Sequence, residues 1–437
     1  MGNIFLKSAA AFFLAALIAC NNNTNDDCAW DNCNNPGSSN SGGGGGNSSD
    51  DNKPNQSNLV LPSIANQEAA NSLYRQWKNI YFRTAQQDID AGEVNPDVIS
   101  LFVDNNAGMA RIRHDKTASG ACATEGICTV SEGIGYAMIM SYFQGERDDF
   151  ERLWRYAVAY SYDVAGKYLM DWKTNSFLYG SIAKGSATDA DLDIATALYL
   201  GYRKWGDEGM LDYAKKVAND IWEFEIEKNN LLILPGNSGW PGRGEYNPSY
   251  FSPVAFRIFA EIDGGHDWNG VLNRNYEWME NMSAKGNLFP DWADANGEPV
   301  KPFTGVANSS YKQYYLESVR VPWRLAWDYA WYGDQRAKTI LDRMAEFTIN
   351  DCEGDPSKIR ERYDFYGAQN YSKGSGKMPQ KASLCATGLA NSSRAGWLNA
   401  CTAAVNETSI SGFNYFPHIL QVMYAQLLNG KYGGRPF

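Results

Sequence analysis

The sequence predicts an all-α fold built as a ring of paired helices. Apolar residues recur at three- and four-residue spacing over most of residues 59–437, which is the pattern of helices that bury one face. Alternating stretches typical of half-buried strands are few and short. Loops rich in Gly, Asn, Pro and Trp separate the helical segments. Helix hairpins repeated over nearly 380 residues indicate a ring whose inner helix ends and loops form one concave face.

Each helical segment carries this periodicity in its own residues. In residues 146–163, one helix face is formed by Phe150, Leu153, Trp154 and Ala157. The same spacing continues in residues 191–206, 213–226, 252–262, 321–333, 335–349 and 416–432.

The first twenty residues have the features of a secretory signal. Lys7 precedes residues 8–19, which are small or apolar, and such a stretch is too short to span a membrane. It ends in Leu17-Ile18-Ala19-Cys20 and resembles a bacterial lipobox, in which Cys20 becomes the lipidated first residue. An ordinary cleaved signal with a chance cysteine is the alternative. The lipobox predicts export and a lipid anchor at the bacterial cell envelope, on the outer membrane or cell surface, with that lipid as the protein's one membrane contact.

The composition of the residues after the signal predicts a flexible tether followed by one domain. Asn, Ser, Gly and Asp dominate residues 21–58, a composition that predicts a disordered linker. Residues 59–437 contain no second linker. The sequence therefore predicts one large domain there, although 379 residues are many for a single domain. We expect a monomer.

Cysteine and histidine usage fits an exported protein without a metal centre. Seven cysteines follow Cys20, namely Cys28, Cys33, Cys122, Cys128, Cys352, Cys385 and Cys401. Cys122 and Cys128 are candidates for a short disulfide loop. An odd number leaves at least one thiol unpaired or paired between chains, and the pairing of Cys352, Cys385 and Cys401 stays open. The sequence has no CxxC motif, and its three histidines are scattered without HExxH spacing, so neither a metal nor a cofactor is expected.

Net charge and aromatic content indicate which classes of molecule the protein binds. The formal net charge is −11 and no run of Lys and Arg appears, which argues against a nucleic-acid partner. The chain has 14 Trp and 26 Tyr. Most of these rings belong to the core, but their excess in an exported protein also suits the flat apolar faces of sugars.

The tripeptide Glu-Gly-Ile occurs twice, at Glu125 and at Glu132. Glu132 opens a run of small and apolar residues that predicts a buried helix, and glycines in its first turn cost about 1 kcal/mol each relative to alanine. Such a cost is tolerated where a helix or ligand approaches Gly133 and Gly135 closely. Partial desolvation there would raise the pKa of Glu132 and make it a usable general acid. The alternative is a helix capped by Ser131, with Glu132 favoured by the helix dipole. Glu125 lies in a polar loop and is expected to be solvated.

A second acidic segment places Asp189, Asp191 and Asp193 at two-residue spacing. This resembles the start of a calcium loop, but Ile194 stands where such a loop needs glycine. The alternative is a helix start capped by Thr188 or Asp189, with one of the three aspartates facing a ligand.

A third carboxylate, Glu317, precedes Arg320 by three residues. A helical turn would place the two side chains together. Pro322 suits a first helical turn, so Glu317 is expected on the loop that leads into the helix. The pair is either a general base held by an arginine or a structural ion pair.

Together these segments resemble glycoside hydrolase family 8, the inverting endoglycanases. The resemblance rests on "TVSEGIGYAM", "MDWK", "SATDADLDIATAL", "NPSYFSPVAFRIFA" and "VRVPWRLAWDYAWYG", in this order from about Arg111 to the C-terminal helix. The combination of Ser-Glu-Gly-x-Gly-Tyr with Asp-x-Asp-x-Asp about 55 residues later is more specific than either motif alone.

The resemblance implies an (α/α)6 barrel with an open cleft across the inner helix ends. Glu132 matches the family's proton donor, and Asp189 matches the aspartate that binds and distorts the sugar at the point of cleavage. Trp172 and Tyr250 match positions that stack on or bond to sugar, and Arg320 is assigned to substrate binding with them. The implied substrate is a β-1,4-linked polysaccharide, with cellulose-type glucan favoured over xylan and chitosan less expected.

The sequence departs from the family at one position. Many members carry Tyr-Asp, with the aspartate as general base, where this chain has Leu316-Glu317. Glutamate is one methylene longer, and an inverting site needs its carboxyls about 6.5–9.5 Å apart. The base is therefore Glu317 or a residue from elsewhere in the cleft. The departure also motivates a rival, a catalytically impaired surface lipoprotein that captures glycans. A purely structural helical lipoprotein would leave the carboxylate motifs unexplained.

Overall fold

The computed structural model describes residues 57–93, 108–114, 122, 128–161, 167–175, 177, 181–303, 310–366 and 375–437. The expected signal over 1–20 with Cys20, the expected linker over 21–58 up to residue 56, and Glu125 lie outside the described residues, so these expectations stay predictions. Residues 52–437 form one compact unit, and the rest of this subsection concerns that unit.

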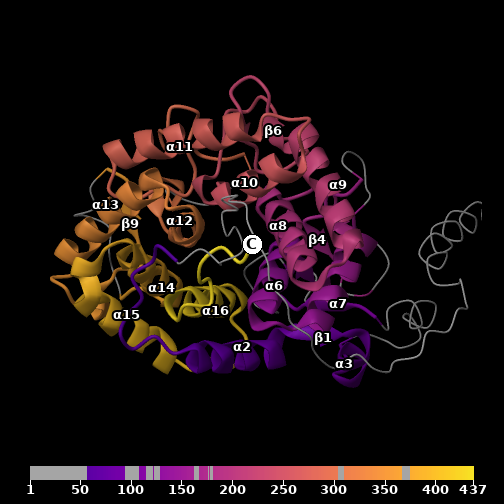
Figure 1. The fold of residues 1–437 in the computed structure, drawn as a ribbon, viewed down its shortest axis with the longest axis horizontal. Helices are drawn as coiled ribbons and strands as arrows, with labels where there is room; N and C mark the ends of the chain where they lie inside the picture. The colour runs from indigo at the N-terminus through magenta and orange to yellow at the C-terminus, as the bar shows by residue number, and fades with distance from the viewer. Residues whose placement is uncertain are drawn as a thin grey trace, which may run out of the picture. The chain divides into compact units, whose positions relative to one another are not determined.

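Twelve of the described helices form two concentric rings (Figure 1). The inner ring consists of α6 (Ser131–Gln144), α8 (Thr188–Trp205), α10 (Pro253–Ile262), α12 (Val321–Tyr332), α14 (Met378–Ala386) and α16 (Tyr415–Leu428). The outer ring consists of α2 (Gln67–Tyr81), α7 (Arg147–Ala159), α9 (Glu208–Glu225), α11 (Trp268–Lys285), α13 (Gln335–Asp351) and α15 (Ala395–Glu407). Each inner helix packs on its two inner neighbours, and α16 packs on α6 to close the ring. The predicted all-α, (α/α)6 barrel is confirmed.

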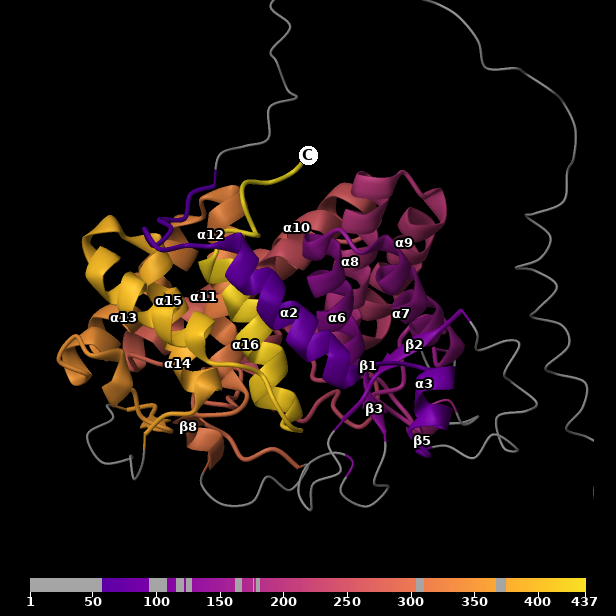
Figure 2. The same cartoon turned by 90° about the horizontal axis from the view of Figure 1, so that it is seen from below.

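The chain alternates between the two rings, so the inner helices run parallel and begin at the same end of the barrel. Short antiparallel strands pair as β1–β2, β3–β4–β5, β6–β7 and β8–β9. Their bounds are β1 (Phe82–Thr84), β2 (Ala110–Ile112), β3 (Thr129–Val130), β4 (Lys173–Thr174), β5 (Ser181–Ala183), β6 (Ile226–Glu227), β7 (Leu232–Ile233), β8 (Gln313–Tyr314) and β9 (Tyr363–Asp364); a short helix, α3 (Ala85–Asp90), follows β1. Figure 2 shows β1, β3, β5 and β8 toward its lower edge and the C-terminus at its upper edge. Because β3 leads directly into α6, the lower edge is the end at which the inner helices begin.

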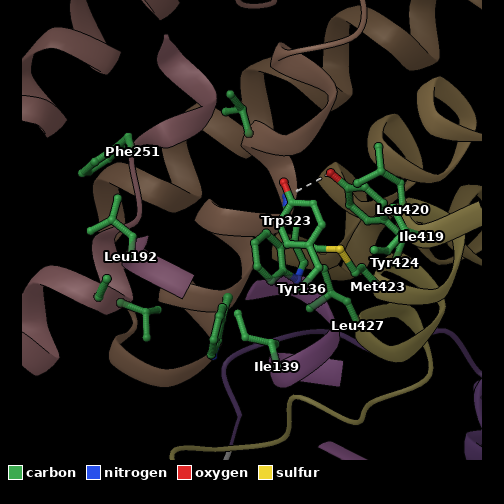
Figure 3. Packing of buried hydrophobic residues seen from close by; sticks show 14 of the residues in the cluster. Tyr136, Ile139, Leu192, Phe251, Trp323, Ile419, Leu420, Met423, Tyr424 and Leu427 are labelled. Carbon is green, nitrogen blue, oxygen red and sulfur yellow. Dashed lines mark hydrogen bonds between the residues drawn. The ribbon is translucent and has the colours of Figure 1, made fainter. Parts of the chain in front are cut away.

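The inner helices are buried on nearly all sides. In α6 every residue from Gly133 to Tyr142 is buried, whereas the outer helices α2 and α7 bury only one face. Tyr136 of α6 meets Trp323 of α12 with ring centroids 5.9 Å apart, and the Tyr424 hydroxyl of α16 lies 3.2 Å from the backbone nitrogen of Trp323 (Figure 3). Aromatic side chains from three inner helices thus fill the barrel axis.

The two glycines of the first turn of α6 allow close packing, as expected. A Cβ atom on Gly135 would lie 2.9 Å from Asp193 Cβ and 3.0 Å from the Ala190 carbonyl oxygen of α8. A Cβ atom on Gly133 would lie 2.7 Å from the Tyr415 hydroxyl of α16. Glycine at these positions lets both neighbouring helices approach the start of α6.

Both capping interpretations are wrong. The residue before α6 is Val130, without a side-chain cap, and the Ser131 amide donates to the Trp172 carbonyl oxygen at 3.0 Å. The ladder between β3 and β4 therefore continues into the helix and replaces the cap. At α8 the preceding residue is Ala187, and the Thr188 amide donates to the Pro235 carbonyl oxygen at 3.2 Å. In both helices a carbonyl oxygen of a neighbouring loop accepts the first amide, and the residue before the helix makes no side-chain cap bond.

Two disulfides occur among the described residues. Cys122 and Cys128 are joined, as the short spacing suggested, and Cys385 of α14 is joined to Cys401 of α15. Cys352 is a buried free thiol. The pairing left open by the sequence is thereby resolved for these five residues.

Membrane-spanning helices and metal-binding clusters are both absent from the part of the chain that the structure describes. None of the helices there has the length and apolarity needed to cross a membrane. No cluster of three or more His, Cys, Asp and Glu side chains there could hold a metal ion.

Candidate active site

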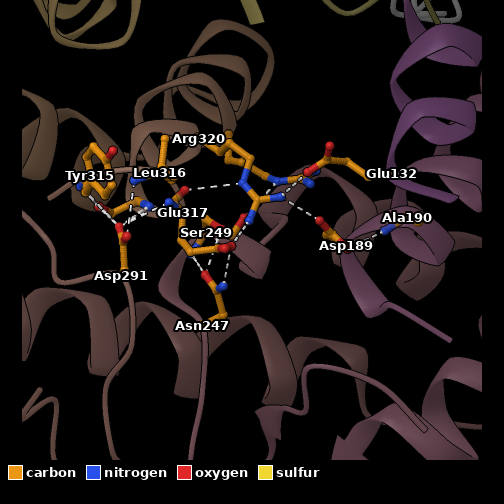
Figure 4. A network of polar contacts seen from close by, with 12 residues as sticks. Glu132, Asp189, Ala190, Asn247, Ser249, Asp291, Tyr315, Leu316, Glu317 and Arg320 are labelled. Carbon is orange, nitrogen blue, oxygen red and sulfur yellow. Dashed lines mark hydrogen bonds and ion pairs between the residues drawn. The ribbon is translucent and has the colours of Figure 1, made fainter. Parts of the chain in front are cut away.

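The beginnings of four inner helices bring distant residues together (Figure 4). Glu132 and Asp189 are the second residues of α6 and α8. Tyr250 ends the short 3-10 helix η1 (Pro248–Tyr250) ahead of α10, and Arg320 ends η3 (Ser318–Arg320) ahead of α12. Helix amino termini favour negative charge, so this end of the barrel suits a cluster of carboxylates.

Arg320 is the centre of the cluster. Its Nη1 donates to Glu132 Oε2 at 2.8 Å and to Asp189 Oδ2 at 2.6 Å. Its Nη2 pairs with Glu317 Oε2, and its Nε donates to the Glu317 carbonyl oxygen at 3.2 Å. One buried guanidinium therefore holds Glu132, Asp189 and Glu317. Its Nη1 atom binds Glu132 and Asp189, and its Nη2 atom binds Glu317.

Glu132 occupies the more buried side of Arg320. Its side chain is 18% exposed, and the Tyr415 hydroxyl donates to Glu132 Oε1 at 3.1 Å. Burial, which outweighs the attraction of Arg320, raises the pKa of Glu132 from 4.5 to about 7, and the nearby Asp189 and Glu317 add to the rise. A carboxyl group with this pKa is able to donate a proton near neutral pH.

Glu317 lies on the loop that leads into α12, as the sequence predicted. Its side chain is 33% exposed, and Asn247 Nδ2 donates to Glu317 Oε2 at 2.8 Å. The Asn247 side chain is itself fixed by its own Oδ1, which accepts from the backbone nitrogen of Ser249 at 3.0 Å. An amide donor and an arginine thus orient one oxygen of Glu317.

The loop that carries Glu317 is built around a buried carboxylate, Asp291. The Asp291 carboxylate accepts backbone N–H bonds from four consecutive residues at 2.9–3.1 Å, namely Tyr315, Leu316, Glu317 and Ser318. The Ser318 hydroxyl adds a fifth bond at 2.8 Å. Asp291 therefore fixes the backbone turn that points Glu317 at Arg320.

The three aspartates of α8 point to three different partners. Asp189 contacts Arg320 in the cluster, whereas Asp193 forms a two-oxygen ion pair with Arg324 inside the barrel. Asp191 instead accepts the Met170 amide at 2.9 Å. Of the three, Asp189 lies in the same cluster as Glu132, so the expectation that one of them faces a ligand stays a prediction and now falls on Asp189.

Trp172 and Tyr250 lie beside the cluster. Trp172 is half-buried, and its carbonyl oxygen receives the Ser131 amide one residue before Glu132. The Tyr250 ring centroid lies 5.3 Å from the Arg320 guanidinium carbon. Burial, together with Asp189 and Glu317, raises the pKa of the Tyr250 hydroxyl well above its usual value, so this hydroxyl remains a hydrogen-bond donor.

Sequence reasoning missed four residues of this site: Tyr136, Asn247, Asp291 and Tyr415. The Tyr136 hydroxyl receives a bond from Arg320 Nη1 at 3.2 Å, and its position four residues after Glu132 was an available signal. Asn247 stood in the quoted segment "NPSYFSPVAFRIFA". Asp291 lies in the loop after α11, and Tyr415 is the first residue of α16. Neither stands in a local motif, so only the fold reveals them.

Comparisons with known proteins found a matching family model and several relatives. The model of the family described as "Glycosyl hydrolases family 8" matches residues 108–426. The chain is 32% identical over 332 residues to Endoglucanase 2 of Ruminiclostridium josui, an alignment that covers 74% of this chain and 67% of that enzyme. It is 33% identical over 253 residues to Endoglucanase A of Acetivibrio thermocellus, covering 56% and 49% of the two chains.

Solved structures with the same fold include glycan-active enzymes. A β-1,3-1,4-glucanase from Paenibacillus sp. X4 superposes with a TM-score of 0.72 at 22% identity, covering 87% of this chain and 98% of that one. The xylose complex of an exo-oligoxylanase from Paenibacillus barcinonensis superposes with a TM-score of 0.65 at 19% identity, covering 84% and 93%. At these identities the superpositions establish the fold alone.

Proposed function

Because the chain belongs to glycosyl hydrolases family 8, and is therefore a glycoside hydrolase, we propose that it cleaves internal β-1,4 linkages of a polysaccharide with inversion at the anomeric carbon. One observation carries the proposal. Glu132 pairs with Nη1 of Arg320 and Glu317 pairs with Nη2, and burial raises the pKa of Glu132 to about 7.

In the proposed reaction Glu132 acts as general acid and Glu317 as general base. The Glu132 carboxyl gives its proton to the glycosidic oxygen as the bond to the anomeric carbon breaks. Glu317 takes a proton from a water molecule, whose oxygen bonds to the anomeric carbon from the opposite face. Asp189 holds the sugar at the point of cleavage away from its relaxed chair, while Trp172 and Tyr250 contact sugar rings.

The resemblance to the inverting endoglycanases is the ground for proposing inversion rather than retention. A retaining site needs two carboxyls about 5–5.5 Å apart, and an inverting site needs them about 6.5–9.5 Å apart with room for a water. Here a guanidinium and a hydrogen bond on each side stand between the two carboxyl groups. Arg320 thus keeps the two carboxyl groups from direct contact, and the proposed reaction places the attacking water between Glu317 and the sugar.

Glucan is the favoured substrate. The relatives at 32–33% identity are named endoglucanases, whereas the exo-oligoxylanase of Paenibacillus barcinonensis is 24% identical over 249 residues. Xylan is the second candidate, since that enzyme belongs to the same set of relatives.

A glycan-capturing protein without catalysis is the rival function. The reason to consider a protein without catalysis is the Leu316-Glu317 pair, since the longer glutamate side chain must place its carboxyl where the family's aspartate would. The orientation of Glu317 by Asn247 and Arg320 favours the enzyme, because a binding protein has no need to orient a base.

The test incubates the purified protein with carboxymethyl-cellulose, mixed-linkage β-glucan, xylan and chitosan and measures new reducing ends. Proton NMR of the first products follows the anomer released. We expect activity on a glucan with the α-anomer appearing first. Binding to any of the four polysaccharides without new reducing ends would support the capture protein and overturn the hydrolase mechanism.

We further propose that the protein is exported and anchored through a lipid on Cys20. The segment Leu17-Ile18-Ala19-Cys20 supports this proposal. Metabolic labelling with a radioactive fatty acid should mark the wild-type protein in a bacterial host, and Cys20→Ser should abolish the label and release the protein from the membrane fraction. Labelling that persists in Cys20→Ser would refute the anchor.

A further inference from the structure

Two carboxyl side chains that the proposed reaction does not use lie buried beneath the site. Asp191 of α8 is the middle aspartate of the acidic segment, and Glu225 is the last residue of α9. Both side chains are fully shielded from solvent. Helices α8 and α9 pack on each other, so the two groups meet at the seam between the inner and outer rings.

Each carboxyl has one oxygen with a donor and one without. Asp191 Oδ1 accepts the Met170 amide at 2.9 Å, and Glu225 Oε1 accepts the Ser186 hydroxyl. No hydrogen-bond partner among the described residues serves Asp191 Oδ2 or Glu225 Oε2. Asp191 and Glu225 instead interact directly with each other, and the Thr188 hydroxyl at the start of α8 also lies against Glu225. Two buried carboxyls in contact cannot both be ionised at low cost, so one proton belongs to the pair.

The pair joins segments that carry residues of the active site. Met170 is two residues before Trp172, and Ser186 is three residues before Asp189. The Ser186 hydroxyl also accepts the Asn237 amide at 3.1 Å, which adds the loop after β7. The Asp191–Glu225 pair is thus the point at which the Trp172 loop, the start of α8 and a third loop are fastened together.

We propose that a proton shared by Asp191 and Glu225 positions Trp172 and Asp189 for the sugar, and that its loss limits substrate binding at alkaline pH. Both are positioning residues, because they act through the Met170 amide and the Ser186 hydroxyl. The inference rests on the proposed function for its substrate, whereas the shared proton itself rests only on the fold.

The direction of the pH effect follows from the surroundings of the pair. Burial is the main cause that raises the pKa of Glu225 from 4.5 to about 8 and that of Asp191 well above its usual value. Asp189 on α8 adds repulsion to both groups, and Tyr213 on α9 also faces Asp191. The neighbouring loops contribute a hydroxyl and amides that do not titrate in this range. The folded protein therefore retains a proton that the unfolded chain loses above pH 4.5, and this stabilisation falls as the pH rises toward 8.

The first arm of the test detects the proton without substrate. Infrared difference spectra at pH 7 between the whole wild-type protein and Asp191→Asn or Glu225→Gln should contain the carbonyl stretch of a protonated carboxyl, and the difference cancels the band of Glu132, whose pKa is also about 7. Each amide replaces the shared proton by a permanent N–H donor and keeps the shape of the pair. The matched control is Asp220→Asn on α9, since Asp220 accepts the Tyr168 amide of the same loop at 2.9 Å and should leave this band unchanged. A band unaffected by both pair variants would overturn the shared proton.

The second arm measures binding of cellohexaose by calorimetry in a Glu132→Gln background, which removes the titration of Glu132. Affinity should fall by up to about tenfold for each pH unit above 8, and adding Asp191→Asn should remove this dependence. Affinity that is constant to pH 10 in the Glu132→Gln protein would overturn the positioning role. If no cellohexaose binds at any pH, the proposed substrate fails. In that case the infrared band and the hydrogen-exchange rate of the Met170 amide from pH 7 to pH 10 decide the role of the pair. Amide exchange that accelerates above pH 8 only when the pair is intact supports the positioning role. An unchanged exchange rate refutes the positioning role.

Discussion

The two carboxylates on either side of Arg320 are held in opposite ways. Glu132 belongs to an inner helix whose first turn is packed against α8 and α16 through Gly133 and Gly135, and only 18% of its side chain is exposed. Glu317 lies on a loop, is 33% exposed, and owes its position to hydrogen bonds from Asn247 and to the turn around Asp291. Helix packing fixes the proposed acid, Glu132, and a polar loop fixes the proposed base, Glu317.

This difference explains where the chain departs from its family. A residue inside close-packed helices cannot change length without a clash or a cavity. A residue on a hydrogen-bonded loop can gain a methylene if the turn shifts slightly. The exchange of Tyr-Asp for Leu316-Glu317 falls on the loop side, which is the side able to absorb it. The predictions below test this contrast.

The largest effect is expected on the helix side. Glu132→Gln keeps the shape of the side chain and removes its proton donor, so kcat should fall by about 10²–10⁴-fold, the range that general acid catalysis supplies. Initial rates on the preferred glucan, measured beside thermal unfolding, provide the check. An unchanged melting temperature with kcat within threefold of wild type would remove Glu132 from the reaction.

On the loop side, Glu317→Gln should lower kcat by about 10²–10³-fold. Glu317→Asp restores the family's residue and is the matched control. Because the turn around Asp291 is placed for the longer side chain, we expect Glu317→Asp to retain part of the activity, within about tenfold of wild type. If Glu317→Gln retains full activity, the base comes from elsewhere in the cleft.

The raised pKa of Glu132 predicts the pH profile of the enzyme. The acid must be protonated, so kcat/KM should fall about tenfold per pH unit above pH 7. The folded protein also holds a proton between pH 4.5 and 7 that the unfolded chain has released, so the contribution of Glu132 to stability falls as the pH rises through that interval. Rates from pH 5 to pH 9 test the first point, and denaturant unfolding of wild type and Glu132→Gln tests the second. A profile that is flat to pH 9 would contradict the assignment.

A smaller effect is expected from the support of the loop. Asp291→Asn replaces an oxygen that accepts amides by an NH2 group that opposes them, and a buried donor left without its acceptor costs about 1–3 kcal/mol. We expect kcat to fall by about tenfold while KM changes less, because the loop places the base rather than the sugar. Equal losses in Glu317→Gln and Asp291→Asn/Glu317→Gln would show that Asp291 acts through Glu317. Additive losses would show an independent role.

How far the sequence predicted this site depends on the same contrast. Glu132, Asp189, Glu317 and Arg320 stood in motifs or at helical spacing, and their meeting at one guanidinium follows from the predicted barrel. Asp291 and Tyr415 stood in no motif, because their contacts with the turn at 315–318 and with Glu132 are made across long sequence separations. The caps proposed at Ser131 and Thr188 were wrong for a related reason. Local rules place the cap at the nearest serine, threonine or aspartate, whereas here both helices begin one residue earlier in the chain, after Val130 and Ala187. Their first amides donate to the carbonyl oxygens of Trp172 and Pro235.

The smallest effect on catalysis, and a clear effect on stability, is expected at Gly135. A methyl group there would lie 2.9 Å from Asp193 Cβ and 3.0 Å from a backbone oxygen of α8, and backbone cannot move aside as a flexible side chain can. Alanine is the better helix former by about 1 kcal/mol, but overpacking costs about 1–3 kcal/mol, so Gly135→Ala should lower the free energy of unfolding by up to about 2 kcal/mol.

The control is Gly396→Ala in the outer helix α15, where a Cβ atom meets nothing within 4 Å and alanine should stabilise the protein. Because Glu132 is held by Arg320 and by the Tyr415 hydroxyl of α16, kcat should stay within about threefold of wild type in both variants. A stable Gly135→Ala protein would show that the acid side is less tightly packed than its distances indicate, and that the contrast between the two carboxylates is one of hydrogen bonding alone.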